Sequence, residues 1–235
     1  MKRPQQRIIA FGWGGWRPGA GRPRSTRRNK IVLHRRRPDV SARNPVHVTL
    51  KLRAELHSLR TQERVQVIRA AFITACKGDG FRIIDWSIQS SHIHLVVEAD
   101  GNAQLSRGMK GFCVRVARGL NRLAGRNGPV FAERYHVHVL STPSETRAAR
   151  CYVIQNRRRH LAQIGRRLRR GWVDPHSSWA FFDGWHDLPP RLENMAAAER
   201  KGPLLAARPQ SWLLRVGWRR SGLVSVNEIP AACRS

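Results

Sequence analysis

Residues 90–98 read Ser-Ser-His-Ile-His-Leu-Val-Val-Glu, the pattern of a β-strand with one polar and one apolar face. Side chains along a strand point alternately to the two faces of a sheet. His92 and His94 therefore share one face, and the apolar residues Ile93 and Leu95 point to the other, buried face. Two neighbouring imidazoles can hold a divalent cation against a phosphate if a third ligand and a nucleophile come from elsewhere.

The sequence on both sides of this strand has the periodicities of an α+β domain. Apolar alternation predicts strands at residues 46–52, 81–87, 91–98 and 130–140. Helical spacing predicts helices at residues 61–77, 102–123 and 142–160. The last helix begins with a capping box, in which Thr142 is the N-cap, Pro143 follows it and Glu145 reaches back. This order of elements is typical of a ferredoxin-like split βαβ antiparallel sheet with an extra C-terminal helix.

Composition divides the chain into three regions. Residues 1–44 are rich in Arg, Gly and Pro and are expected to form a basic, disordered arm. Arg22 and Arg24 in this arm could enter a minor groove of DNA, or the arm could simply be a solvated charged tail. Residues 45–171 contain the predicted sheet and helices, and residues 172–235 form a Trp-rich tail whose packing the sequence leaves open.

Charge limits the classes of partner. The chain of 235 residues has 44 Lys and Arg against 15 Asp and Glu, a formal net charge of +29. This excess favours a polyanion, and guanidinium groups favour nucleic acid because they match phosphates and base edges. No stretch approaches the roughly 20 apolar residues of a membrane span, and no signal peptide is evident. We therefore expect a cytoplasmic, nucleoid-associated protein that makes no membrane contact.

The last predicted helix carries further polar groups. Tyr152 and Asn156 are four residues apart, so they lie on one helical face. If that face covers the histidine strand, the Asn156 carbonyl oxygen joins the two imidazoles in a ligand set that fits Mg²⁺ or Mn²⁺. Tyr152 could then attack a phosphorus atom, expel a 3′-hydroxyl and become linked to the 5′-phosphate.

Several stretches carry a resemblance to a known family. Besides the His-Ile-His strand, they are Gly14-Gly-Trp-Arg-Pro-Gly-Ala-Gly-Arg-Pro23, Phe131-Ala-Glu-Arg-Tyr-His-Val-His-Val-Leu140, Tyr152-Val-Ile-Gln-Asn-Arg-Arg-Arg-His160 and Trp212-Leu-Leu-Arg-Val-Gly-Trp218. Together they resemble the single-tyrosine HUH transposases, and among these the REP-associated tyrosine transposases of the RayT group. One departure is that Gln155-Asn156-Arg157 lacks the Asn-Pro of many relatives.

The resemblance implies a set of roles. His92 and His94 would bind the metal, with Asn156 as the third ligand, and Tyr152 would be the nucleophile. The implied substrate is single-stranded, hairpin-forming DNA. Related enzymes include monomers and homodimers, so both states stay open.

Other interpretations remain at this stage. A second motif, His136-Val-His138, is expected to be structural or DNA-facing, because the family that the chain resembles carries the metal on the earlier strand. The two pairs can be told apart in a structure, since only one pair can face Tyr152. The candidate phosphate contacts in the folded region are Lys110, Arg118, Arg157, Arg158 and Arg159. The alternative to a DNA endonuclease and strand transferase is a non-catalytic, nucleic-acid-binding or regulatory protein on the same fold.

Overall fold

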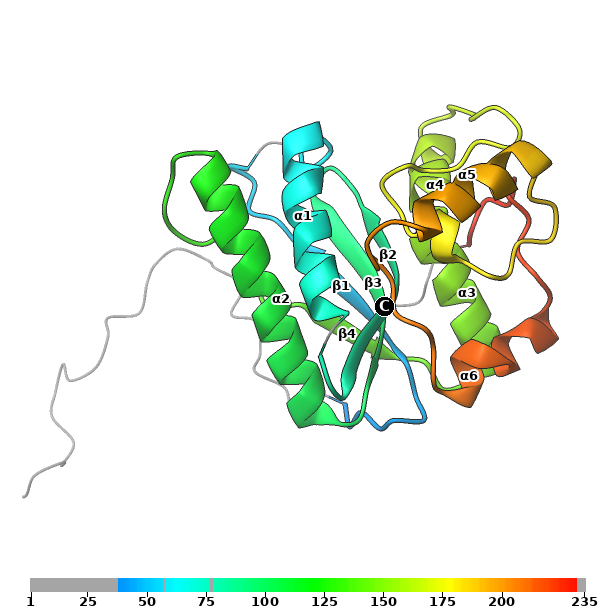
Figure 1. The fold of residues 1–235 in the computed structure, drawn as a ribbon, viewed down its shortest axis with the longest axis horizontal. Helices are drawn as coiled ribbons and strands as arrows, with labels where there is room; N and C mark the ends of the chain where they lie inside the picture. The colour runs from blue at the N-terminus through cyan, green and yellow to red at the C-terminus, as the bar shows by residue number, and fades with distance from the viewer. Residues whose placement is uncertain (1–37, 57, 77, 232–235) are drawn as a thin grey trace, which may run out of the picture. The chain divides into compact units, whose positions relative to one another are not determined.

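Four antiparallel strands form one sheet in the order β2-β3-β1-β4, within the residues that the structure describes. The structure is a computed structural model, and it describes residues 38–56, 58–76 and 78–231. The strands are β1 (Val46–Lys51), β2 (Phe81–Ile88), β3 (His92–Ala99) and β4 (His136–Val139) (Figure 1). This strand order, with helices after β1 and β3, confirms the predicted ferredoxin-like α+β fold.

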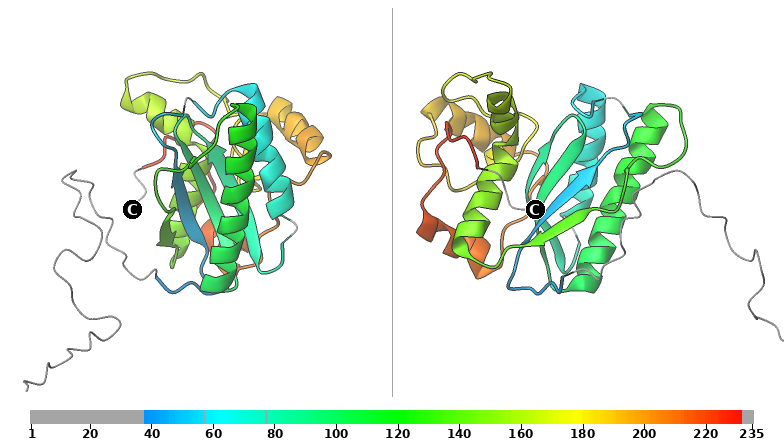
Figure 2. Two further views of the ribbon diagram at one scale, coloured as in Figure 1. Left: turned by 90° about the vertical axis from the view of Figure 1, so that its left-hand side faces the viewer. Right: turned by 180° about the vertical axis from the view of Figure 1, so that it is seen from behind.

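The helices α1 (Gln62–Ala75) and α2 (Asn102–Leu123) cover one face of the sheet (Figures 1 and 2). Val48 and Leu95 point to this face and are fully buried. Phe72 of α1 stacks on Phe112 of α2 with ring centroids 5.1 Å apart. The main core of the protein therefore lies between the sheet and these two helices.

The helix α3 (Pro143–Ile154) lies against the opposite face of the sheet. Its N-terminus is the predicted capping box: Glu145 N donates to Thr142 Oγ1 at 3.2 Å, and Thr142 N donates to Glu145 Oε2 at 3.2 Å. The helix is shorter than predicted, because it ends before Gln155 and α4 (Asn156–Gln163) begins after it. The Gln155 side chain donates to Ser225 O at 2.6 Å, so a distant loop holds the residue at the break.

The strand β4 is also shorter than the predicted 130–140. Its first residues leave the sheet after a single bridge between Leu52 and Phe131, and regular pairing with β1 begins only at His136. In an edge strand, one side of the backbone has no sheet partner to hold it in register, which permits this interruption.

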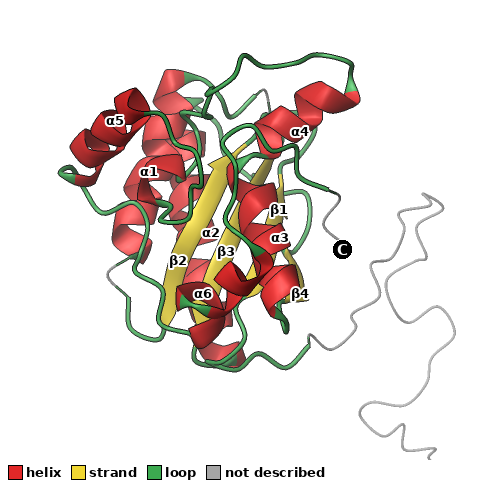
Figure 3. Cartoon of the chain, turned by 90° about the vertical axis from the view of Figure 1, so that its right-hand side faces the viewer, coloured by secondary structure: helices red, strands yellow, loops and turns green. Residues whose placement is uncertain are grey.

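Residues 172–231 are not a separate tail. They contain η1 (Trp179–Phe181), α5 (Pro190–Arg200), α6 (Trp212–Arg215) and η2 (Gly217–Ser221). Of these, α6 and η2 pack beside α3, whereas α5 lies beside α1 (Figure 3). The buried carboxylate of Glu98 on β3 accepts hydrogen bonds from the backbone of Gln210 and Ser211. The described residues between 38 and 231 belong to one compact unit, so the expected boundary at residue 171 does not divide the structure.

The folded unit also begins before the expected boundary at residue 44. Val40 is buried in the main core, and Ser41 forms a β-bridge with Gly101, so the residues just before β1 belong to the folded unit. The rest of the arm, with Arg22 and Arg24, lies outside the described residues. Among the described helices, none combines the length and apolar character needed to cross a membrane.

Candidate active site

The two histidines of β3 lie on the face of the sheet that α3 covers. His92 pairs with Lys51 of β1 and His94 with Thr49, while Ile93 between them is fully buried. The rings of His92 and His94 are nearly parallel, with centroids 6.0 Å apart. The alternation read from the sequence therefore places both imidazoles on one polar surface, as expected.

Tyr152 of α3 faces this histidine surface. Its ring meets the His94 ring edge-on, with centroids 5.4 Å apart and an interplanar angle of 87°. Val153, the next residue, is fully buried in the apolar cluster between α3 and the sheet, which fixes the rotation of the helix. Tyr135, the other tyrosine of the chain, packs instead against the core on the far side of the sheet. Only Tyr152 of the two is therefore placed to act with the histidines.

His47 of β1 completes this arrangement, and the sequence interpretation did not identify it. Its ring stacks on His94 at 5.6 Å and meets the Tyr152 ring edge-on at 5.6 Å. Burial, with a smaller contribution from His138, lowers the pKa of His47 to about 4, so its imidazole is neutral at pH 7. The signal was present in the sequence: in Val46-His-Val48, the alternation already places His47 on the polar face.

Two hydroxyl groups contact the rings of His94 and His92. Thr49 Oγ1 lies 3.2 Å from His94 Nδ1, and Ser91 Oγ lies 2.8 Å from His92 Nδ1. When Nδ1 carries the proton and donates to the hydroxyl, the Nε2 lone pair of each ring is free for a metal ion. Burial is the main cause that lowers the pKa of both rings, and it lowers that of His94 strongly. Both rings are therefore neutral at pH 7, the form that binds metals.

The side chain of Asn156 is unusual in being buried with both of its polar atoms unpaired among the described residues. Its side chain is fully buried, and neither Oδ1 nor Nδ2 has a hydrogen-bond partner among the described residues. A buried polar group without a partner costs about 1–3 kcal/mol and calls for an explanation. Within the described residues, no three His, Cys, Asp or Glu side chains gather as a metal site. A cation held by His92 and His94 would thus need an oxygen of another residue type, and Asn156 fits that need.

A family comparison covers the whole of this site. Residues 45–156 match the family described as "Transposase IS200 like". Over this range the chain is similar to the IS200-like transposases. The range contains all four strands, both histidines of β3, Tyr152 and Asn156, and the match confirms the transposase resemblance noted in the sequence.

The chain is similar to a solved structure entitled "Structure of the REP associates tyrosine transposase bound to a REP hairpin", with 18% sequence identity and a TM-score of 0.48. That similarity covers 62% of this chain and 81% of the other. No curated protein matches the chain.

The second histidine pair, His136 and His138, lies on the same face of the sheet. His136 pairs with Thr49 and His138 with His47, so both project from the same face as His92 and His94. Among the described histidines of the two pairs, His94 is the one whose ring contacts the Tyr152 ring. The two pairs differ in position: β4 is the edge strand, His136 is exposed, and its Nε2 lies 3.3 Å from Glu133 Oε1.

Two candidate phosphate contacts lie away from the candidate active site. Lys110 and Arg118 are exposed on α2, which covers the face of the sheet opposite Tyr152. From this face they cannot contact a phosphate held at Tyr152. Helical periodicity alone does not indicate which face of the sheet a helix covers, so this placement could not be read from the sequence.

The three consecutive arginines of α4 have different environments. Arg158 is buried, and its guanidinium donates to Trp172 O at 2.9 Å and to Gln155 Oε1 at 3.2 Å, so it serves packing rather than DNA contact. Arg159 donates to Pro230 O at 2.8 Å, and its guanidinium lies 5.8 Å from the centre of the Tyr152 ring. Arg157 is half-buried. Arg159 is thus the cation of this run that lies beside the candidate nucleophile.

Proposed function

We propose that this protein is a tyrosine transposase of the REP-associated type that cleaves and rejoins single-stranded, hairpin-forming DNA. The observation that carries the proposal is the 5.4 Å contact between the rings of Tyr152 and His94 on a sheet face that also presents His92. The family match and the net charge of +29 support a DNA substrate.

The chemistry assigned to Tyr152 is nucleophilic attack on a DNA phosphate. Its phenolic oxygen forms a bond to phosphorus, the bond from phosphorus to the 3′-oxygen breaks, and the departing 3′-oxygen takes up a proton. The 5′-phosphotyrosine formed in this way conserves the energy of the ester. A 3′-hydroxyl of a second strand end can then displace the tyrosine and rejoin the DNA.

A divalent cation is part of the proposal. Bound Mg²⁺ or Mn²⁺ supplies Lewis-acid polarisation of the scissile phosphate. His92, His94 and Asn156 would hold it through two nitrogens and one amide oxygen, a set with hard and borderline ligands. Ser91 and Thr49 would orient the two imidazoles.

The place of action follows from the substrate. A DNA transposase works where chromosomal DNA is found, which we propose to be the nucleoid in the cytoplasm. Both a monomer and a homodimer are compatible with a site that takes Tyr152 and the histidines from one chain.

The deciding experiment is a search for the covalent intermediate. The full-length protein is incubated with a labelled single-stranded hairpin and Mg²⁺, and the products are separated under denaturing conditions. Tyr152→Phe should abolish the labelled protein band. Tyr135→Phe is the matched control, since it removes the same hydroxyl from the other side of the sheet and should leave the band intact.

Two results would count against the proposal. One is a covalent band that Tyr152→Phe retains. The other is the absence of any band over a panel of hairpins that the protein binds, which would leave the non-catalytic DNA-binding protein as the better account.

A further inference from the structure

A cleft of about 490 Å³ lies between β2, α3 and the C-terminal segment, apart from the candidate active site at Tyr152. This volume falls in the range of roughly 300–1,000 Å³ typical of small-ligand sites. Part of its wall is apolar and is formed by Phe181, Leu204 and Ala207. Its charged lining consists of Arg150, Arg200, Arg208, Arg215 and Asp183.

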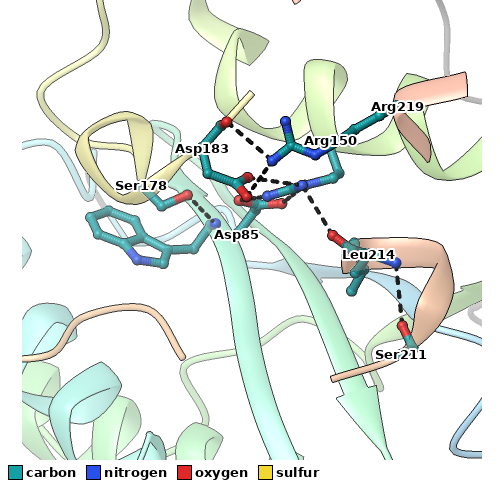
Figure 4. A network of polar contacts seen from close by, with 8 residues as sticks. Asp85, Arg150, Ser178, Asp183, Ser211, Leu214 and Arg219 are labelled. Carbon is teal, nitrogen blue, oxygen red and sulfur yellow. Dashed lines mark hydrogen bonds and ion pairs between the residues drawn. The ribbon is translucent and has the colours of Figure 1, made fainter. Parts of the chain in front are cut away.

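The floor of the cleft is a fixed ion-pair network (Figure 4). Arg150 Nε donates to Asp85 Oδ2 at 2.7 Å, and both side chains are almost fully buried. Asp183 lies 3.4 Å from Arg150 Nη1 and accepts a hydrogen bond of 2.5 Å from Arg219. Both carboxylates near the floor are therefore paired with guanidinium groups.

The rim of the cleft carries positive charge that remains uncompensated. Arg208 and Arg215 are exposed, and neither forms an ion pair or a side-chain hydrogen bond with another described residue. Within the described part of the chain, Arg200 donates to a backbone oxygen, that of Ala180, at 2.9 Å, and no carboxylate there pairs with its charge. Three guanidinium groups around one opening favour an anionic ligand, and their planar forks match phosphate oxygens.

The cleft and the candidate active site lie on opposite flanks of α3. Arg150 precedes Tyr152 by two residues, about 200° of helical rotation. Arg150 points to Asp85 of β2, whereas Tyr152 points to His94 of β3. Since a helix is only about 10 Å wide, a strand bound at Tyr152 can reach the cleft within a few nucleotides.

We propose that this cleft binds one unpaired nucleotide of the DNA strand on which Tyr152 acts. The inference rests on the proposed function, because it takes the substrate to be single-stranded DNA. The base lies against Phe181 and the aliphatic wall, and Arg208 and Arg215 hold the adjoining phosphate. An inorganic anion alone would leave the apolar wall exposed to water, whereas a nucleotide satisfies both parts of the lining.

The test measures binding of a fluorescein-labelled single-stranded dT 12-mer to the full-length protein by anisotropy. The variant Arg208→Ala/Arg215→Ala removes the two rim charges. The control Arg107→Ala/Arg118→Ala removes two exposed charges from α2, on the other side of the sheet. We expect the rim variant to bind about tenfold more weakly and its salt slope to fall by about 0.7, the value for one phosphate contact, with a smaller loss and an unchanged slope in the control.

A second variant tests the base contact. Phe181→Leu keeps an apolar side chain but removes the stacking surface, and we expect about fivefold weaker binding of the same 12-mer. The midpoint of thermal unfolding is recorded beside it to detect a loss of folding. A 12-mer that contains 5-iodo-deoxyuridine should photo-crosslink to a peptide that includes Phe181.

The outcomes separate this inference from the proposed function. Equal losses in the rim and α2 variants, or crosslinks confined to peptides outside residues 181–215, would overturn the cleft assignment while leaving Tyr152 chemistry intact. If the unaltered protein binds no single-stranded DNA, both proposals fall. A rim variant that still forms the Tyr152 adduct on a hairpin, but needs more DNA to do so, would agree with both.

Discussion

Replacing Arg150 with methionine should lower the free energy of unfolding more than the same replacement at any exposed arginine would. The guanidinium is 2% exposed, donates to Asp85 at 2.7 Å and lies 4.5 Å from the centre of the Phe182 ring and 4.6 Å from that of Trp218. Methionine fills similar space but leaves the Asp85 carboxylate buried without its cation. Breaking a buried pair in this way costs about 3–5 kcal/mol of unfolding free energy.

The assay is urea denaturation at pH 7 for the unaltered protein, for Arg150→Met and for Arg150→Met/Asp85→Asn. The double variant removes the stranded charge and should recover more than half of the loss. A loss below about 1 kcal/mol in the single variant, or a double variant as unstable as the single one, would refute the reasoning.

The same variant should respond to pH in a defined direction. Burial is the main cause that raises the pKa of Asp85, and Arg150 opposes that rise. Without Arg150 the folded-state pKa rises further above the unfolded value, so the folded state binds a proton more tightly. The deficit of Arg150→Met should therefore shrink as the pH falls toward the ordinary aspartate range near 4 and grow as the pH rises above it.

Two other predictions concern the candidate active site. Burial holds the pKa of His47 near 4 in the folded state, against 6.5 in the unfolded state, so the unfolded state binds the proton more tightly. The unaltered protein should therefore lose up to roughly 3 kcal/mol of unfolding free energy as the pH falls from 6.5 to 4. His47→Phe should remove this part of the pH dependence. Urea unfolding across that range measures this loss, and an identical slope in the variant would contradict it. Asn156→Leu should leave the unfolding free energy unchanged or raise it by about 1 kcal/mol, because two unpartnered buried atoms disappear. It should also abolish the Mg²⁺-dependent covalent adduct; a variant that keeps full adduct formation would exclude Asn156 as a ligand.

Local patterns in the sequence predicted the parts of the site that depend on one element. The alternation around His92 and His94 placed both on one face, and the capping box at Thr142 fixed where α3 begins. These features follow from backbone geometry over a few residues, so no distant contact was needed to infer them.

Contacts between distant segments decided the rest. The end of α3 depends on Gln155, whose side chain is held by Ser225 O, 70 residues further along the chain. The irregular pairing of β2 between Ile83 and Asp85 turns Asp85 toward α3, where strict alternation would place it with Ile83 on the other face. Neither effect has a local signature.

The sequence by itself determined the fold class, the shared face of the β3 histidines and the similarity of residues 45–156 to the IS200-like transposases. Only the tertiary structure decided that α3 rather than α2 covers that face, that His47 joins Tyr152, and that residues 172–231 build an arginine-lined cleft. The physical reason is that periodicity is encoded in each segment by itself, whereas the choice of partner for each face emerges from the summed burial of apolar surface across the whole domain.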